Sequence, residues 1–168
     1  MNDRILFIGP QGCGKSTQAV LLAEYLRIPK ISTGDIFREM SQVKDILAAG
    51  QLVDDETTAE IVKKRLQESD CQNGFILDGY PRSIAQKELF DPRFSCVIYL
   101  KVPDTEVTRR MMARGREDDT LESIKTRLSL YYEQTQPLLD YYKNQGILIE
   151  VDGTGSVEAI QNEIKKSI

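Results

Sequence analysis

Hydrophobic residues along the chain follow two patterns that alternate from one end to the other. Short apolar runs predict strands, and longer segments with an apolar residue at every third or fourth position predict helices. Strands are expected at Arg4–Ile8, Lys30–Ser32, Gly74–Asp78, Cys96–Lys101 and Ile147–Val151, and helices at Thr17–Leu26, Thr57–Ser69, Thr120–Tyr142 and Ser156–Ser167. One more helix is expected after Pro103, with Asp104 as its N-cap, and Ser156 is expected to cap the last helix.

The third and fourth predicted strands are continuous apolar runs, Phe75–Leu77 and Val97–Leu100. A parallel sheet covered on both faces requires such runs. Strands alternating with helices predict a three-layer α/β/α fold with a five-stranded parallel sheet, and ligands bind such sheets beyond the carboxyl ends of the strands. Residues 34–69 are mostly helical in pattern, which indicates an insertion at that rim. With no repeat, low-complexity segment or linker, one domain over residues 1–168 is expected.

Residues Gly9–Ser16 read Gly-Pro-Gln-Gly-Cys-Gly-Lys-Ser and fit the pattern G-x-x-x-x-G-K-[ST]. They stand between the first predicted strand and the first predicted helix, where glycines let the backbone wrap a polyphosphate at a helix N-terminus. Lys15 is expected to reach the β- and γ-phosphates, and the Ser16 hydroxyl to hold Mg²⁺. Cys13 is interpreted as a small residue that fits inside the loop.

Composition narrows the chemistry further. A net charge of −4 argues against a general nucleic-acid binder, and the chain contains no apolar run long enough to span a membrane. Three widely spaced cysteines and no signal-peptide pattern indicate a cytoplasmic protein without a disulfide framework. The chain has no histidine, so Ser-His-Asp and Cys-His nucleophile schemes are excluded. Phosphoryl transfer, which depends on positioning, cations and Mg²⁺, is left as the favoured reaction class.

One carboxylate and several arginines are candidate partners of a phosphate. Asp78 ends an apolar strand and is expected to hold the hydration shell of Mg²⁺, although a turn or N-cap role is an alternative. Arg110 and Arg114 are four residues apart on one helix, where like charges repel. A solvated surface tolerates this repulsion, and an anion bound between the two arginines would offset it. Further candidates are Arg38, Arg82, Arg116 and Arg127.

Taken together, these motifs resemble those of the adenylate kinases, within the wider nucleoside monophosphate kinase family. The resemblance covers nearly the whole chain and is most specific in Asp-Gly-Tyr-Pro-Arg, residues 78–82. The matching blocks are residues 9–18, Ile31-Ser-Thr-Gly-Asp-Ile-Phe-Arg38, Gly50-Gln-Leu-Val53, residues 74–86, Arg114-Gly-Arg-Glu-Asp-Asp119, then Arg127, Tyr132, Thr135, Pro137 and Val151-Asp-Gly153.

The resemblance implies reversible phosphoryl transfer from MgATP to AMP, giving two ADP, by a monomer. The residues that it implies for ATP are Gly12, Cys13, Gly14, Lys15, Ser16, Thr17 and Arg110, and those for AMP are Thr33, Arg38, Val53, Gly79, Arg82 and Gln86. The implied catalytic residues are Lys15, Arg82, Arg114, Arg116 and Arg127. The Mg²⁺ site expected from the glycine loop and the end of the third strand is Ser16 with Asp78, partly through water. AMP is favoured because pyrimidine-specific relatives tend to carry alanine and asparagine where Thr33 and Gln86 stand.

Three positions depart from the family pattern. Ser16 stands where glycine is usual, which permits direct Mg²⁺ ligation, and Asp54 stands where proline is frequent. Only Gly115 separates Arg114 from Arg116, so the lid is expected to be minimal, at about residues 114–118, beside a monophosphate-binding insertion at about 33–70. Two alternatives stay open: a kinase of another nucleoside monophosphate, and a nucleotide-binding protein with little transfer activity.

Overall fold

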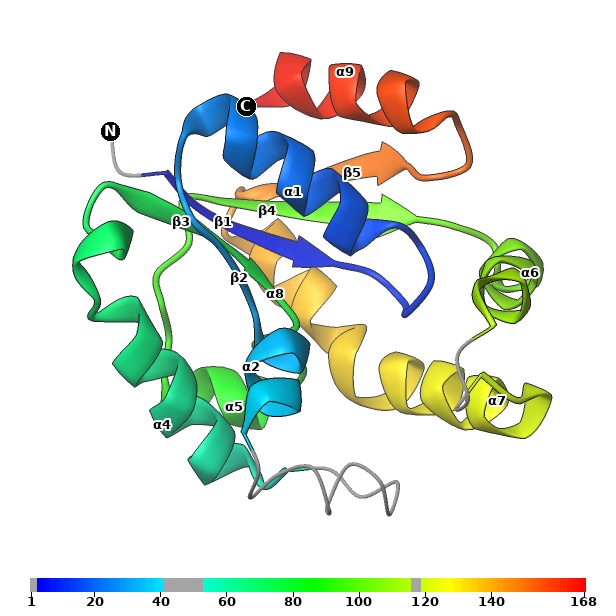
Figure 1. Cartoon of the computed structure of the whole chain (residues 1–168), viewed down its shortest axis with the longest axis horizontal. Helices are drawn as coiled ribbons and strands as arrows, with labels where there is room; N and C mark the ends of the chain where they lie inside the picture. The colour runs from blue at the N-terminus through cyan, green and yellow to red at the C-terminus, as the bar shows by residue number, and fades with distance from the viewer. Residues whose placement is uncertain (1–2, 41–52, 116–118) are drawn as a thin grey trace.

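The computed structural model describes residues 3–40, 53–115 and 119–168 (Figure 1). Five strands form one sheet in the order β2-β3-β1-β4-β5, and every neighbouring pair is parallel. The strands are β1 (Asp3–Ile8), β2 (Lys30–Ser32), β3 (Gly74–Asp78), β4 (Cys96–Lys101) and β5 (Leu148–Asp152). The predicted fold class is therefore confirmed, and β5 begins one residue later than expected.

Helices cover both faces of the sheet (Figure 1). They are α1 (Lys15–Leu26), α2 (Thr33–Glu39), α4 (Asp55–Leu66), α5 (Ile84–Leu89), α6 (Asp104–Arg114), α7 (Leu121–Leu130), α8 (Pro137–Asn144) and α9 (Val157–Ser167). The helix predicted at Thr57–Ser69 begins earlier, because Asp54 caps it by accepting a 2.8 Å hydrogen bond from the Thr57 amide. Ser156 caps α9 as predicted, at 3.2 Å from the Ala159 amide.

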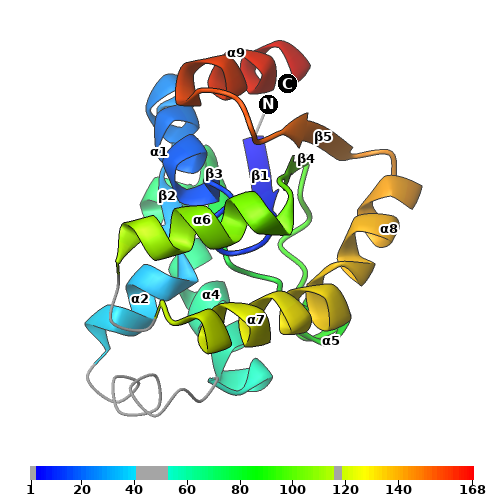
Figure 2. The same ribbon diagram turned by 90° about the vertical axis from the view of Figure 1, so that its right-hand side faces the viewer.

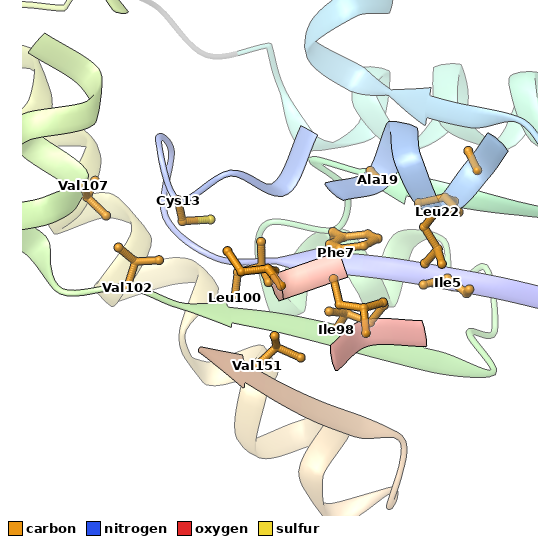
Figure 3. Close-up of a cluster of buried hydrophobic side chains, with 14 of the residues drawn as sticks. Ile5, Phe7, Cys13, Ala19, Leu22, Ile98, Leu100, Val102, Val107 and Val151 are labelled. Carbon is orange, nitrogen blue, oxygen red and sulfur yellow. The ribbon is translucent and has the colours of Figure 1, made fainter. Parts of the chain in front are cut away.

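Alternating side chains of the strands pack into two separate hydrophobic cores. Ile5 and Phe7 of β1 pack in one core with α1 and α9, whereas Leu6 and Ile8 pack in the other with α4 and α8. Successive strand residues point to opposite faces, so a strand buried on both sides must be apolar throughout. Figure 3 shows the first core, where Phe7 and Ile98 meet the helix residues Ala19 and Leu22. This double burial explains the continuous apolar runs in the sequence.

Asp104 is not the N-cap of α6, which corrects the prediction. Pro103 occupies the cap position, and no side chain accepts a hydrogen bond there. Asp104 is instead the first helical residue, and its carboxylate accepts a hydrogen bond from the hydroxyl of Tyr132, which lies just after the end of α7. A proline at the cap fixes the backbone entering the helix, and this frees the carboxylate for the second helix.

The single helix predicted at Thr120–Tyr142 is divided by a π-turn at Tyr131–Thr135. Gln136 donates its amide to the Tyr131 carbonyl at 2.9 Å, five residues back. Pro137 follows and has no amide hydrogen to continue an ordinary helical ladder. The chain passes through this wider turn directly from α7 into α8, and the two helices point in different directions (Figure 2).

Candidate active site

A cavity of about 910 Å³ opens where the carboxyl ends of β1, β2 and β3 meet. It is lined by the glycine loop, by α6 and by the end of α7 with the π-turn. Predicted site residues among its lining are Gly12, Cys13, Gly14, Lys15, Ser16, Thr17, Arg38, Asp78, Gly79, Arg82, Arg110, Arg114 and Arg127. The fold thus brings most of the described candidates to one place.

The glycine loop leads from β1 into the N-terminus of α1. Gly14 occupies the N-cap with a φ of 102°, a left-handed conformation that glycine adopts without strain. It has no side chain to cap the helix, so the first-turn amides are open to an anion. The Lys15 ammonium lies on this loop, donating to the carbonyl oxygens of Gly9 at 2.7 Å and Pro10 at 2.9 Å.

Ser16 and Asp78 meet at the floor of the cavity. The Ser16 hydroxyl donates to Asp78 Oδ2 at 2.5 Å, and Asp78 is 6% exposed. A hydroxyl and a carboxylate supply the hard oxygen ligands that Mg²⁺ prefers, and the metal takes its other ligands from water and phosphate. Among the described residues no three acidic or thiol side chains cluster as a metal site. The pair therefore fits a cation that arrives with a nucleotide.

The loop after β3 forms a second wall. The Arg82 Nε donates to the Gly79 carbonyl at 2.9 Å, and the Thr33 hydroxyl donates to the same oxygen at 3.1 Å. Gly79 has a φ of 97°, and a Cβ there would lie 2.5 Å from Thr33 Oγ1. Only glycine fits this position, so the turn brings β2 and β3 together beneath the cavity.

Gln86 is buried beside this wall and does not line the cavity. Its Oε1 accepts a 2.8 Å hydrogen bond from the Arg82 amide, and its Nε2 donates to Asp55 Oδ1 at 2.7 Å. A side-chain amide has two N–H donors and two acceptor sites, so these bonds use half of its capacity. The remaining N–H and acceptor site are not used by these two hydrogen bonds.

Arg38 reaches the cavity from α2. Its guanidinium pairs with the Asp35 carboxylate one turn earlier, and Lys30 Nζ lies 3.1 Å from the same carboxylate. Burial works to raise the pKa of Asp35, but the hydrogen bonds from Lys30 and Arg38 outweigh it and leave the pKa below its usual value. Asp35 is therefore ionised near neutral pH and orients Arg38.

Asp119 gathers the arginines of the two helices α6 and α7. Arg114 places Nε and Nη2 at 2.9 Å and 2.7 Å from the two carboxylate oxygens, and Arg127 Nη1 lies 3.2 Å from Oδ1. The Asp119 side chain is fully buried, with an exposed fraction of 0%. A buried carboxylate that pairs with two arginines holds both in fixed orientations beside the cavity.

Arg110 has a different set of partners. It donates to the carbonyl oxygens of Cys13 at 3.1 Å and Gly153 at 2.9 Å, and its Nε pairs with Glu106 at 2.7 Å. Hydrogen bonds from Arg109 and Arg110 lower the pKa of Glu106 to about 2. Repulsion between Arg110 and Arg114 is thus offset by a separate carboxylate for each.

The adenylate kinase family model matches residues 7–147 of this chain. An adenylate kinase from Corynebacterium urealyticum is 45% identical over 172 residues, which cover 94% of each chain. One from Leptospira biflexa is 43% identical over 184 residues, with 98% of this chain and 99% of the relative covered. The chain belongs to the adenylate kinase family. It is an enzyme that transfers a phosphoryl group reversibly between ATP and AMP.

This adenylate kinase lacks segments that some relatives carry. Its alignment with the Thermotoga maritima adenylate kinase runs over 211 residues, although the chain has 168 and 98% of it is covered. In the structure, α6 ends at Arg114 and α7 begins at Leu121. Arg116, predicted to be catalytic, lies outside the described residues. Among those that are described, no helix is long and apolar enough to cross a membrane.

Two predicted site residues besides Gln86 are also absent from the cavity lining. Thr33 is buried beneath it, and Val53 is half-buried. Glu106 and Asp119, the carboxylates that orient the arginines, were not among the predicted site residues. Their positions in the sequence could have predicted these pairs. Glu106 is four residues before Arg110 on one helix, and Asp119 ends the Arg-Gly-Arg-Glu-Asp-Asp block.

Proposed function

We propose that the cavity transfers the phosphoryl group directly between MgATP at the glycine loop and AMP beside Arg38 and Arg82. The observation that carries this proposal is the convergence of Lys15, Arg82, Arg114 and Arg127 from four separate segments on one cavity. Each is a fixed cation, and phosphoryl transfer is accelerated chiefly by positioning and by charge stabilisation. No covalent intermediate is required.

On this proposal each cation has a separate task. The Lys15 ammonium bridges the transferring group, while Arg38 and Arg82 clamp the phosphate of AMP. Arg114, Arg127 and Arg116 neutralise the charge that spreads over the transferring oxygens. Arg110, held beside Cys13 and Gly153, lies against the adenine of ATP.

The Mg²⁺ site is assigned to Ser16 and Asp78. Their contact supports this assignment, because the hydroxyl and carboxylate are already adjacent at the start of α1. Ser16 would ligate the ion directly, and Asp78 would hold its water ligands. When bound, Mg²⁺ supplies charge neutralisation on the β- and γ-phosphates.

For acceptor recognition, Gln86 is assigned to the N1/N6 edge of adenine. Its unused N–H and lone pair are the donor and acceptor that this edge requires. Thr33 and the backbone near Val53 complete the base site. The assigned insertion spans about residues 33–70 and the minimal lid about 114–118. We further infer a monomer. We also infer a cytoplasmic location, with which the three free thiols agree.

The acceptor assignment is tested by a panel of monophosphates. With MgATP as donor, kcat/KM for AMP should exceed that for CMP and UMP. Gln86→Ala should reduce kcat/KM for AMP by about 5- to 150-fold, the range for a buried polar group that loses its partner, and should leave the KM for ATP nearly unchanged. Gln67→Ala, an exposed change after α4, is the control. A wild-type preference for a pyrimidine monophosphate would contradict the base assignment.

A further inference from the structure

Thr135 makes a contact that none of the assigned roles uses. Its hydroxyl donates to the main-chain carbonyl of Arg82 at 2.7 Å. Thr135 lies at the end of the π-turn, 53 residues away along the chain, and lines the cavity. A π-turn inside a helix often marks a functional position. Here it sets a hydroxyl against the residue assigned to the phosphate of AMP.

Arg82 is held by contacts on three sides. Its amide donates to Gln86, its carbonyl accepts from Thr135, and its Nε donates to the Gly79 carbonyl. The first two contacts fix the peptide units on either side of the Cα atom. They therefore set the direction in which the guanidinium leaves the backbone.

The helical run that supplies Thr135 also supplies Arg127. Arg127 lies in α7, which passes directly through the π-turn and into α8 (Figure 2). The Thr135 contact is thus a link between the element that carries a donor-side arginine and the backbone of the acceptor-side arginine. Loss of the Thr135 hydroxyl keeps both arginine side chains in the protein but removes this hydrogen bond to the Arg82 backbone.

We propose that Thr135 is a positioning residue that orients Arg82 toward the phosphate of AMP. This inference rests on the proposed role of Arg82. Removal of one hydrogen bond of ordinary net strength corresponds to a change of about fivefold in an equilibrium constant. The change in binding should fall on AMP and spare ATP, because the substrate group that Arg82 is assigned to clamp is the phosphate of AMP.

Calorimetric titration of AMP and of ATP into matched variants tests the proposal. Thr135→Val removes the donor at constant shape, Thr135→Ser keeps it, and Thr126→Val removes an exposed threonine hydroxyl that bonds Glu122 on α7. Thr135→Val should raise the Kd for AMP about fivefold and leave that for ATP within twofold. Thr135→Ser and Thr126→Val should match the wild type. An unchanged Kd for AMP, or equal changes for both nucleotides, would overturn the proposal.

A double-mutant cycle separates this inference from the function that it rests on. In an Arg82→Ala background, Thr135→Val should have no further effect on AMP binding. If the fivefold loss persists there, Thr135 does not act through Arg82 and the proposal is overturned. If Arg82→Ala alone leaves the Kd for AMP unchanged, the assigned role of Arg82 fails, and the positioning role fails with it.

Discussion

The Ser16 hydroxyl donates a 2.5 Å hydrogen bond to the Asp78 carboxylate, which joins the first turn of α1 to the last residue of β3. The two residues are 62 positions apart along the chain. They meet because β1 and β3 are parallel neighbours, so the segments that follow both strands leave the same edge of the sheet. This contact places a candidate metal ligand beside the phosphate loop.

Asp78→Asn should raise the Mg²⁺ concentration that half-saturates activity. A neutral amide holds the water ligands of the cation less tightly, and changes of this kind cost about 10- to 100-fold in metal affinity. The measurement is initial rate against free Mg²⁺ at fixed ATP and AMP. Asp140→Asn, an exposed change on α8, should follow the wild-type curve. Coincident curves for Asp78→Asn and wild type would remove Asp78 from the metal site.

Arg127→Ala should lower kcat by about two orders of magnitude, the scale for one charge-stabilising group. The arginine is held on Asp119 and lines the cavity, so its charge is set in place before substrate binds. Steady-state turnover with saturating ATP and AMP measures the effect. Lys125→Ala removes an exposed cation from the same helix and should leave turnover unchanged. Equal turnover of the two variants would mean that Arg127 pairs with Asp119 but has no role in catalysis.

The short connection between α6 and α7 predicts imperfect exclusion of water. A closing lid keeps water from the reacting phosphate, and little chain is present here to form one. Phosphate release from MgATP without AMP should be measurable in the wild type and should disappear in Lys15→Met.

Arg116→Ala should lower kcat about 100-fold or more, the scale for a charge-stabilising group, as measured by turnover with saturating ATP and AMP. Normal turnover in that variant would mean that Arg116 is not a catalytic group.

Two thiols should resist alkylation at neutral pH. Burial raises the pKa of Cys71 and the pKa of Cys96 to about 11 each, from an ordinary value of 9.0. A raised thiol pKa keeps the unreactive protonated form, so alkylation of these residues should speed up about tenfold per pH unit from pH 7 to 10. Iodoacetamide labelling read by peptide mass spectrometry provides the measurement. A rate that levels off just above pH 9.0, the ordinary pKa, would show an ordinary exposed thiol.

Local patterns were enough to predict the sheet and the phosphate loop. Continuous apolar runs located β3 and β4 because both faces of the sheet are covered, and the glycine motif is read from adjacent residues. The prediction that Asp104 is the N-cap of α6 was wrong. Its carboxylate accepts a hydrogen bond from Tyr132, a residue that the sequence pattern does not place beside it. A tertiary contact decided the role of that side chain.

The counter-ions of the arginines were missed for a similar reason. Arg114 and Arg127 share Asp119 only because α6 and α7 pack together, and charge spacing along one helix indicates repulsion and not this pairing. The π-turn was also missed, since Tyr131 to Thr135 keep the apolar spacing of a regular helix. Pro137 was the one local sign of an interruption.

We propose that Lys15 at the glycine loop acts on the phosphoryl group that passes from ATP to AMP. The most direct test of this proposal is ADP formation from MgATP and AMP by Lys15→Met, beside Lys64→Met, which removes an exposed cation of α4. Lys15→Met should lose about two to three orders of magnitude in kcat with unchanged thermal unfolding, and Lys64→Met should equal the wild type. A folded Lys15→Met protein with near-normal turnover would contradict the account.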